Sequence, residues 1–227
     1  MMRLPDDWPF FEAGSPTDPN HSNPELRPTE HLLRDLQAGR PVILIDDNDR
    51  ENEGDIVLPA ENATEEWLAF IIRYTGGVIC LSMPNELADH LELPPMVAKN
   101  QAPRGTAYTV SIEAAEGTTT GISAKDRALT IRTTVKAGVL PTDLVRPGHV
   151  FPLRAAEGGV LARDGHTEGS VDLARLAGFK PVAAISEVMH DDGTMMRTSA
   201  LLQFGAQHGL SVGTIADLVR YRVRHGR

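Results

Sequence analysis

The chain of 227 residues contains one cysteine, Cys80, and no hydrophobic run of 18 residues. A single cysteine excludes an internal disulfide and suits a reducing compartment. Without a long apolar run there is no candidate transmembrane helix, and the acidic, proline-rich start of the chain does not resemble a signal peptide. These absences predict a cytoplasmic protein that does not interact with membranes.

The sequence also lacks GxGxxG and Walker patterns, so nucleotide-binding folds lose support. Acidic residues outnumber basic ones, 31 to 22, giving a net charge of −9. A chain of this charge is not expected to bind nucleic acid or membrane surfaces in general. A local basic pocket can still bind a small phosphorylated ligand, so the composition leaves that partner open.

Proline and polar residues interrupt residues 1–27, which we expect to form a flexible N-terminal arm. Residues 28–227 are expected to form one catalytic domain. Hydrophobic patterns and caps predict helices near 29–38, 64–75, 84–91, 123–135, 167–177, 198–208 and 214–224, and strands near 42–46, 55–59, 78–81, 108–112, 150–153 and 181–188. Several strand pairs have no helix between them, which favours an α+β fold with a mixed β-sheet flanked by helices.

The segment 46–55, DDNDRENEGD, holds six acidic residues and one arginine between two short aliphatic runs. Carboxylates that are buried without partners cost several kcal/mol each, and a divalent cation is the simplest compensation. If the segment is extended, Glu51, Glu53 and Asp55 point to one side. The alternative is a solvated acidic loop.

The segment Arg163 to Thr167 precedes an apolar helical stripe and combines a guanidinium, a glycine, a histidine and a hydroxyl. The free N–H groups of a helix start suit phosphate, and an arginine can add a two-pronged contact. His166 can bind a metal or transfer protons. The alternative is that Thr167 only caps the helix.

Three further residues and one run of threonines can carry chemistry or be structural. His149 follows Pro147 and Gly148, where a lone histidine is often structural. Glu187 ends an apolar strand, where its pKa is expected to rise and suit proton transfer, unless it faces solvent. Cys80 can be a nucleophile or a small buried hydrophobe. The threonines at 118–120 can bind a polyol or cap a helix.

Four motifs in order, at 47–55, 117–123, 147–152 and 165–168, resemble those of the 3,4-dihydroxy-2-butanone 4-phosphate synthase family. The resemblance covers residues 28–224. It implies a lyase of riboflavin biosynthesis that converts ribulose 5-phosphate to 3,4-dihydroxy-2-butanone 4-phosphate and formate. It also implies a homodimer with active sites near its interface, so that His149 acts on the partner subunit's substrate.

The resemblance further implies Mg²⁺ or Mn²⁺ as cofactor, with two ions per site. The implied metal ligands are Glu51 and His166, and the implied catalytic residues are His149 and Glu187. The implied substrate contacts are Arg50, Glu51, Asp55, Arg163, Asp164, Gly165, His166, Thr167 and Glu187. We expect Asp55 or Glu53 to act in an early proton transfer and Glu187 and His149 in later ones.

Two residues depart from the family pattern: Asp164 replaces a small residue and Gly169 replaces alanine. We expect the Asp164 side chain to face away from the phosphate. The chain is expected to be monofunctional, without a GTP cyclohydrolase domain. Two alternatives stay open, a metal-dependent sugar phosphatase, for which no nucleophile motif is found, and a non-catalytic binding protein of the same fold.

Overall fold

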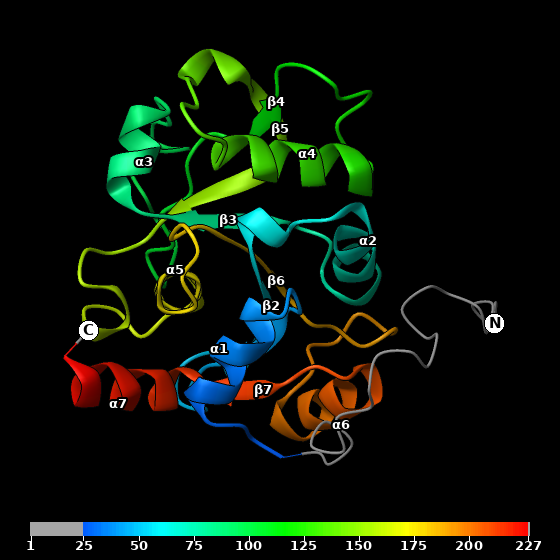
Figure 1. The fold of residues 1–227 in the computed structure, drawn as a ribbon, viewed down its shortest axis with the longest axis vertical. Helices are drawn as coiled ribbons and strands as arrows, with labels where there is room; N and C mark the ends of the chain where they lie inside the picture. The colour runs from blue at the N-terminus through cyan, green and yellow to red at the C-terminus, as the bar shows by residue number, and fades with distance from the viewer. Residues whose placement is uncertain (1–24, 227) are drawn as a thin grey trace.

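The computed structural model describes residues 25–226, in which a mixed sheet is covered by helices on both faces (Figure 1). Across these residues seven strands form one sheet in the order β4-β5-β3-β6-β2-β1-β7. β1 pairs antiparallel with β2 but parallel with β7, and β3 pairs parallel with β5. The predicted α+β class with a mixed sheet is therefore confirmed. The strands are β1 (Val42–Ile45), β2 (Gly54–Pro59), β3 (Cys80–Met83), β4 (Ile112–Ala114), β5 (Leu144–Arg154), β6 (Ala183–Glu187) and β7 (Val212–Thr214).

Helices divide between the two faces of the sheet. Helices α1 (Thr29–Gln37), α5 (His166–Leu176) and α7 (Ile215–His225) contribute to the apolar core on one face. Helices α2 (Glu65–Tyr74), α3 (Asn85–His90), α4 (Ala124–Thr134) and α6 (Thr198–His208) contribute to the core on the other. Three short 3₁₀ turns lie at η1 (Ala60–Asn62), η2 (Pro141–Asp143) and η3 (Gly159–Leu161).

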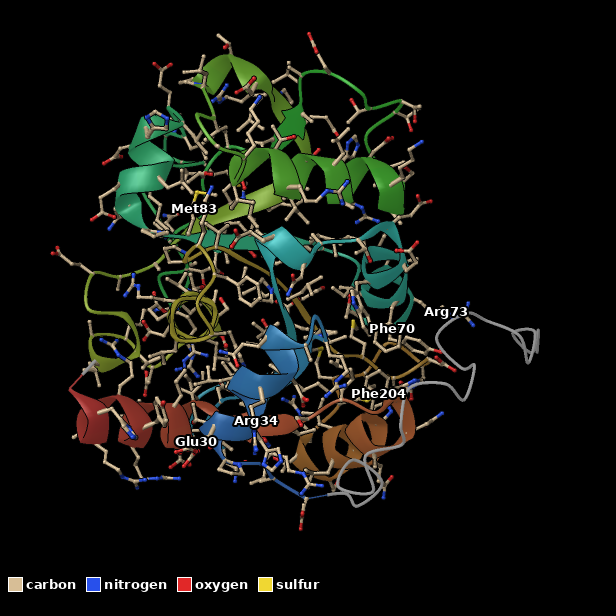
Figure 2. All side chains as sticks on the ribbon, viewed as in Figure 1. Glu30, Arg34, Phe70, Arg73, Met83 and Phe204 are labelled. Atoms are coloured by element: carbon tan, nitrogen blue, oxygen red, sulfur yellow. The ribbon has the colours of Figure 1, made fainter. Side chains whose placement is uncertain are left out.

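Alternation along the strands assigns each side chain to a face. Leu44 and Val57 belong to the core beneath α5, whereas Ile43 and Ile56 belong to the core beneath α6. Each fully buried aliphatic side chain contributes roughly 1.5–3 kcal/mol. The same alternation places Asp55, two residues before Val57, on the α5 face. On the opposite face Phe70 of α2 packs against Phe204 of α6, with ring centroids 6.1 Å apart (Figure 2).

Three elements differ from the sequence prediction. β7 was not predicted, because three residues around Gly213 carry too short a pattern. The strand expected at 108–112 is instead β4 at 112–114, with only isolated bridges at Tyr108 and Thr109. β5 begins at Leu144 rather than at 150, so it runs through Pro147.

The predicted arm, residues 1–27, lies mostly outside the described residues. Its last part is described: Leu26 bridges to Val212, and the Arg27 backbone N–H donates to the Val212 carbonyl oxygen at 2.7 Å. The chain thus enters the domain beside β7. Among the described helices, none combines the length and the apolar composition needed to span a membrane.

Candidate active site

Asp46, Glu51 and His166 bring one ligand atom each to a common point, with all three atoms within 4.8 Å of one another. Asp46 follows β1, Glu51 lies in the turn between β1 and β2, and His166 is the first residue of α5. Two carboxylates and an imidazole suit a hard divalent cation. The structure therefore joins the two predicted ligands, Glu51 and His166, although 115 positions separate them, and adds Asp46.

The turn that carries Glu51 is ordered by its own charges, so the alternation considered for an extended segment does not apply to it. Arg50 Nη1 donates to Asp46 Oδ2 at 2.8 Å and to Glu51 Oε2 at 2.5 Å. The backbone N–H groups of Glu51 and Glu53 donate to the Asp46 carboxylate at 3.0 and 2.8 Å. A carboxylate with three partners organises the loop more than it binds a cation, so Glu51 and His166 remain the better ligands.

His166 is buried, and its Nε2 atom has no hydrogen-bond partner within residues 25–226. Burial lowers the pKa of His166, and Arg50 lowers it further, while Asp46 and Glu51 act in the opposite direction. The imidazole is therefore neutral at pH 7, which is the form that ligates metals. A buried nitrogen without a partner, beside two carboxylates, fits a site for a cation.

Asp55 and Glu187 stand directly opposite each other on β2 and β6. Asp55 is buried, its Oδ1 atom lacks a hydrogen-bond partner in the described part of the chain, and this atom lies 3.7 Å from His166 Nδ1. Burial, followed by the charge of Glu187, raises the pKa of Asp55 well above its ordinary value. A carboxyl with a raised pKa suits proton transfer near neutral pH.

The loop before α5 is built around Gly165, which occupies the N-cap position without any side-chain cap. The alternative that Thr167 caps the helix is therefore wrong. A Cβ atom on Gly165 would lie 2.2 Å from Arg163 Nη1, so only glycine lets the guanidinium fold over this turn. Arg163 Nη1 also pairs with Glu168 Oε2 at 2.5 Å. A guanidinium beside free helix N–H groups suits a phosphate.

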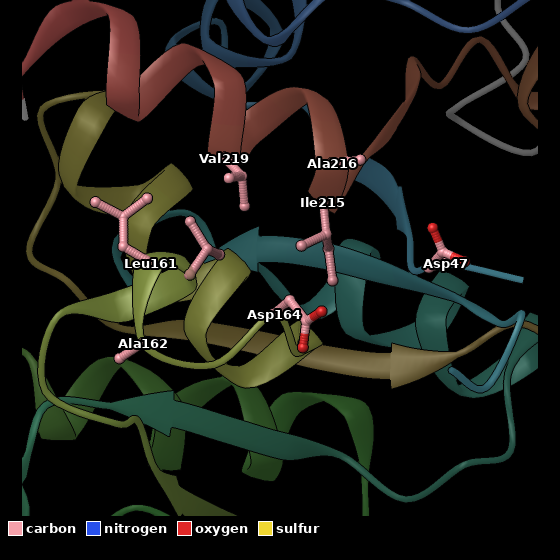
Figure 3. A pocket seen from close by; sticks show the side chains of 8 residues that line it. Asp47, Leu161, Ala162, Asp164, Ile215, Ala216 and Val219 are labelled. Carbon is pink, nitrogen blue, oxygen red and sulfur yellow. The ribbon is translucent and has the colours of Figure 1, made fainter. Parts of the chain in front are cut away.

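Asp164 and Thr167 line different hollows. Arg163, Thr167 and Glu168 line a hollow of about 240 Å³. Asp164 is exposed and lines a larger one of about 550 Å³, between η3 and the start of α7 (Figure 3). Mostly apolar side chains line the larger hollow, and none of the three cluster residues does so. The site is therefore assigned from the cluster and not from the larger hollow.

Gly169, the second departure from the family pattern, has a packing reason. It lies in the first turns of α5, and a Cβ atom there would lie 2.6 Å from Leu44 Cδ2 of β1. Because Gly169 has no Cβ atom, α5 can approach the sheet closely. The same helix supplies His166, so this close approach also brings the imidazole toward the acidic turn.

Two further arginines hold the acidic turn, and no sequence pattern indicates either of them. Arg104, in the connection between α3 and β4, donates to the Arg50 carbonyl oxygen, and its Nε lies 3.9 Å from Glu51 Oε1. Arg197, just before α6, donates to the carbonyl oxygens of Glu51 and Asn52 at 2.7 and 2.6 Å. Such contacts join residues 50 or more positions apart and follow no local pattern.

His149 lies outside this cluster. It belongs to β5, and β3 separates β5 from the strand that carries Glu187. Neighbouring strands lie about 4.8 Å apart, so two spacings place the backbones roughly 10 Å from each other. The structure therefore gathers Glu51, Asp55, His166 and Glu187 but not His149.

Cys80 is buried beneath α5, with its Sγ 3.7 Å from the Tyr108 hydroxyl. Burial raises the pKa of Cys80 to about 12, so the side chain stays a thiol at neutral pH. A thiol is a poor nucleophile. The structure therefore favours the interpretation of Cys80 as a small buried hydrophobe.

Together the fold and the cluster define a class of protein, an α+β enzyme with a divalent-cation site next to a helix N-terminus that suits phosphate. Residues 30–221 match the model of the 3,4-dihydroxy-2-butanone 4-phosphate synthase family. The chain belongs to this family, as its four sequence motifs predicted.

Similar proteins support this assignment to the family. A Haemophilus influenzae protein named 3,4-dihydroxy-2-butanone 4-phosphate synthase is 56% identical over 199 residues, which is 86% of this chain and 93% of the relative. The riboflavin biosynthesis protein RibBA of Salinispora arenicola is 54% identical over 195 residues, which is 86% of this chain but 46% of that longer protein. A solved structure of a 3,4-dihydroxy-2-butanone 4-phosphate synthase in complex with two magnesium ions is 43% identical, with a TM-score of 0.84, covering 86% of this chain and 96% of that one.

Proposed function

We infer that the protein is a lyase that converts D-ribulose 5-phosphate to 3,4-dihydroxy-2-butanone 4-phosphate and formate in riboflavin biosynthesis. The observation that carries this inference is the meeting of Asp46, Glu51 and His166 at the start of α5, in a chain of this family. Neither the sugar phosphatase nor the non-catalytic alternative has an observation in its favour.

We propose that Glu51 and His166 hold Mg²⁺, that Mn²⁺ can replace it, and that two ions share the site. The fit is supported by Nε2 of His166, which has no hydrogen-bond partner in the described part of the chain, and by the carboxylate of Glu51 in the same cluster. When bound, the cation stabilises negative charge on adjacent oxygens of the sugar. Asp46 and Arg50 keep the Glu51 side chain in place through their shared hydrogen bonds.

The substrate phosphate is assigned to the start of α5. Arg163 and Thr167 line one hollow there, and Gly165 leaves the first N–H groups of the helix without a side-chain cap. The exposed Asp164 lines another hollow, so we propose that only its backbone meets the ligand. This arrangement orients C1 to C4 of the sugar toward Glu51, Asp55 and Glu187.

The reaction needs several proton transfers in one pocket. Removal of a proton from C1 of the ketose forms an enediolate, water is lost, and the carbon skeleton rearranges. Water then adds back at the C4 carbonyl, and cleavage of the bond to C4 releases formate, so that no water is lost overall. We assign the early transfer to Asp55 or Glu53, because burial raises the pKa of both carboxyls. Arg50 and Glu187 contact the substrate, and Glu187 serves the later transfers.

We propose that the protein is a homodimer in the cytoplasm and that His149 serves the partner's substrate. The proposal is supported by the separation of His149 from Glu187 within one sheet. Mixing His149→Ala and Glu51→Gln chains tests it. Random pairing gives dimers of which half are mixed, each with one intact site, so about a quarter of the wild-type activity should return. No recovery would contradict the shared site.

The activity itself is tested with purified protein, ribulose 5-phosphate and Mg²⁺. Formate should accumulate without inorganic phosphate, and EDTA should stop its release. Release of inorganic phosphate instead would identify a sugar phosphatase. Neither product, with the protein folded and ribulose 5-phosphate still bound, would indicate a binding protein.

A further inference from the structure

His149 on β5 has a partner on the neighbouring strand: its Nδ1 lies 2.7 Å from Glu113 Oε2 on β4. We propose that Glu113 is a positioning residue that fixes the tautomer and orientation of His149, so that Nε2 is the atom presented to the substrate. The inference rests on the proposed function, in which His149 transfers protons. It adds a residue, Glu113, that the motifs and the metal cluster do not include.

The two side chains are buried unequally. The Glu113 side chain is 10% exposed, whereas that of His149 is 43% exposed. The second carboxylate oxygen of Glu113 is 3.5 Å from Thr130 Oγ1, a buried hydroxyl that also accepts the Ala114 N–H at 3.0 Å. The carboxylate end of the pair is therefore anchored inside the domain, while the imidazole end is open to a ligand.

Two glycines leave the space that the Glu113–His149 pair needs. Gly121 has φ +86°, and a Cβ atom there would lie 2.0 Å from Glu113 Oε2. A Cβ atom on Gly148 would lie 2.1 Å from the carbonyl carbon of Ile112, the residue before Glu113. The motifs at 117–123 and 147–152 therefore converge on the Glu113–His149 contact. This convergence explains the glycines of the threonine-rich motif, which the metal cluster leaves unexplained.

The hydrogen-bonding capacity of the two side chains determines which nitrogen of His149 carries the proton. An ionised carboxylate only accepts hydrogen bonds, so Nδ1 of His149 must carry the proton. In the neutral imidazole Nε2 then holds the lone pair, and no residue within 25–226 occupies it with a hydrogen bond. Nε2 takes a proton from the substrate, the charged imidazolium is stabilised by Glu113, and Nε2 returns the proton in a later step. Glu113 itself neither gains nor loses a proton.

The first test is spectroscopic and needs no turnover. ¹⁵N NMR of histidine-labelled protein should show His149 with its proton on Nδ1. In Glu113→Gln the amide can also donate, so the Nε2–H tautomer should become populated. Glu116→Gln, which changes an exposed glutamate nearby, should leave the signal unchanged. A wild-type His149 with its proton on Nε2 would overturn the proposal.

Kinetics supply the second test. Glu113→Gln should lower kcat at least about tenfold, with KM changed less than about twofold, because the residue acts through His149 and does not touch substrate. Glu113→Asp, one methylene shorter, should show the same split if Gln disturbs folding. Wild-type kcat in a folded Glu113 variant would refute the inference. Failure of the wild-type protein to release formate would instead refute the proposed function.

Discussion

Asp55→Asn should make the metal-free protein more stable while it removes activity. Asp55 is buried with one oxygen unpartnered among the described residues, and Glu187 faces it across the strand pair. Burial and the charge of Glu187 raise the pKa of Asp55 above the ordinary value of 3.8. Between 3.8 and this raised pKa the folded chain binds more protons than the unfolded chain, so the stability falls as the pH rises through this window.

The magnitude follows from the cost of burying a carboxylate as a charged group with an unpartnered oxygen, about 1–3 kcal/mol, which a neutral amide avoids. For a domain of this size each kcal/mol shifts Tm by roughly 2–4 °C. Asparagine cannot ionise, so the variant should melt roughly 2–12 °C above the wild-type protein at pH 7. Below pH 3.8 the Asp55 carboxyl is protonated in both the folded and the unfolded chain. The part of the Tm difference that arises from its ionisation should therefore vanish.

The assay is thermal unfolding in EDTA at a series of pH values from 3.5 to 8. Formate release with Mg²⁺ restored should fall at least about a hundredfold, because a group that transfers protons has been lost. Asp47→Asn, an exposed residue of the same acidic segment, is the matched control and should change neither quantity. A variant that is less stable than wild-type at pH 7, or a gap that does not depend on pH, would refute the reasoning.

Three further predictions concern other residues. His166→Ala and Glu51→Ala should each abolish Mn²⁺ binding measured by electron paramagnetic resonance, without unfolding the domain. An ion that still binds to either variant would show that the metal site lies elsewhere. Arg104→Gln should change Mg²⁺ binding by no more than about fivefold in calorimetry, since an exposed ion pair contributes about 1 kcal/mol at most; a change of a hundredfold would make Arg104 a far stronger determinant. Burial lowers the pKa of His208 to about 4, so stability should be lost as the pH falls from 6.5 toward 4, by about 1–2 kcal/mol after allowing for partial exposure, and His208→Leu should remove this slope in urea unfolding.

Local patterns predicted most of the fold. Thr64 accepts the Trp67 N–H and Ser123 accepts the Asp126 N–H, as helix caps chosen from sequence should. The aliphatic runs around the acidic turn became β1 and β2. The order of the strands was not predictable, because it depends on which distant segments pair, such as β1 with β7.

The candidate site was predictable in its residue types and not in its geometry. The density of carboxylates at 46–55 indicated a cation site, and Glu51 and His166 do meet. The directions of the side chains in the turn were not predictable, because the pairing of Arg50 with Asp46 and Glu51 is a property of the folded loop. Glu113 and Arg104 carried no local signal, since each acts on a residue far away in the sequence.

In the proposed reaction these residues remove C4 of ribulose 5-phosphate with the help of a divalent cation at Glu51 and His166. Ribulose 5-phosphate labelled with ¹³C at C4 tests it in one ¹³C NMR time course, with Mg²⁺ and then with EDTA. The label should appear in formate with Mg²⁺, and its transfer should stop on chelation and be absent in His166→Ala. Label that stays in the four-carbon phosphate, or formate that forms equally in EDTA, would contradict the account.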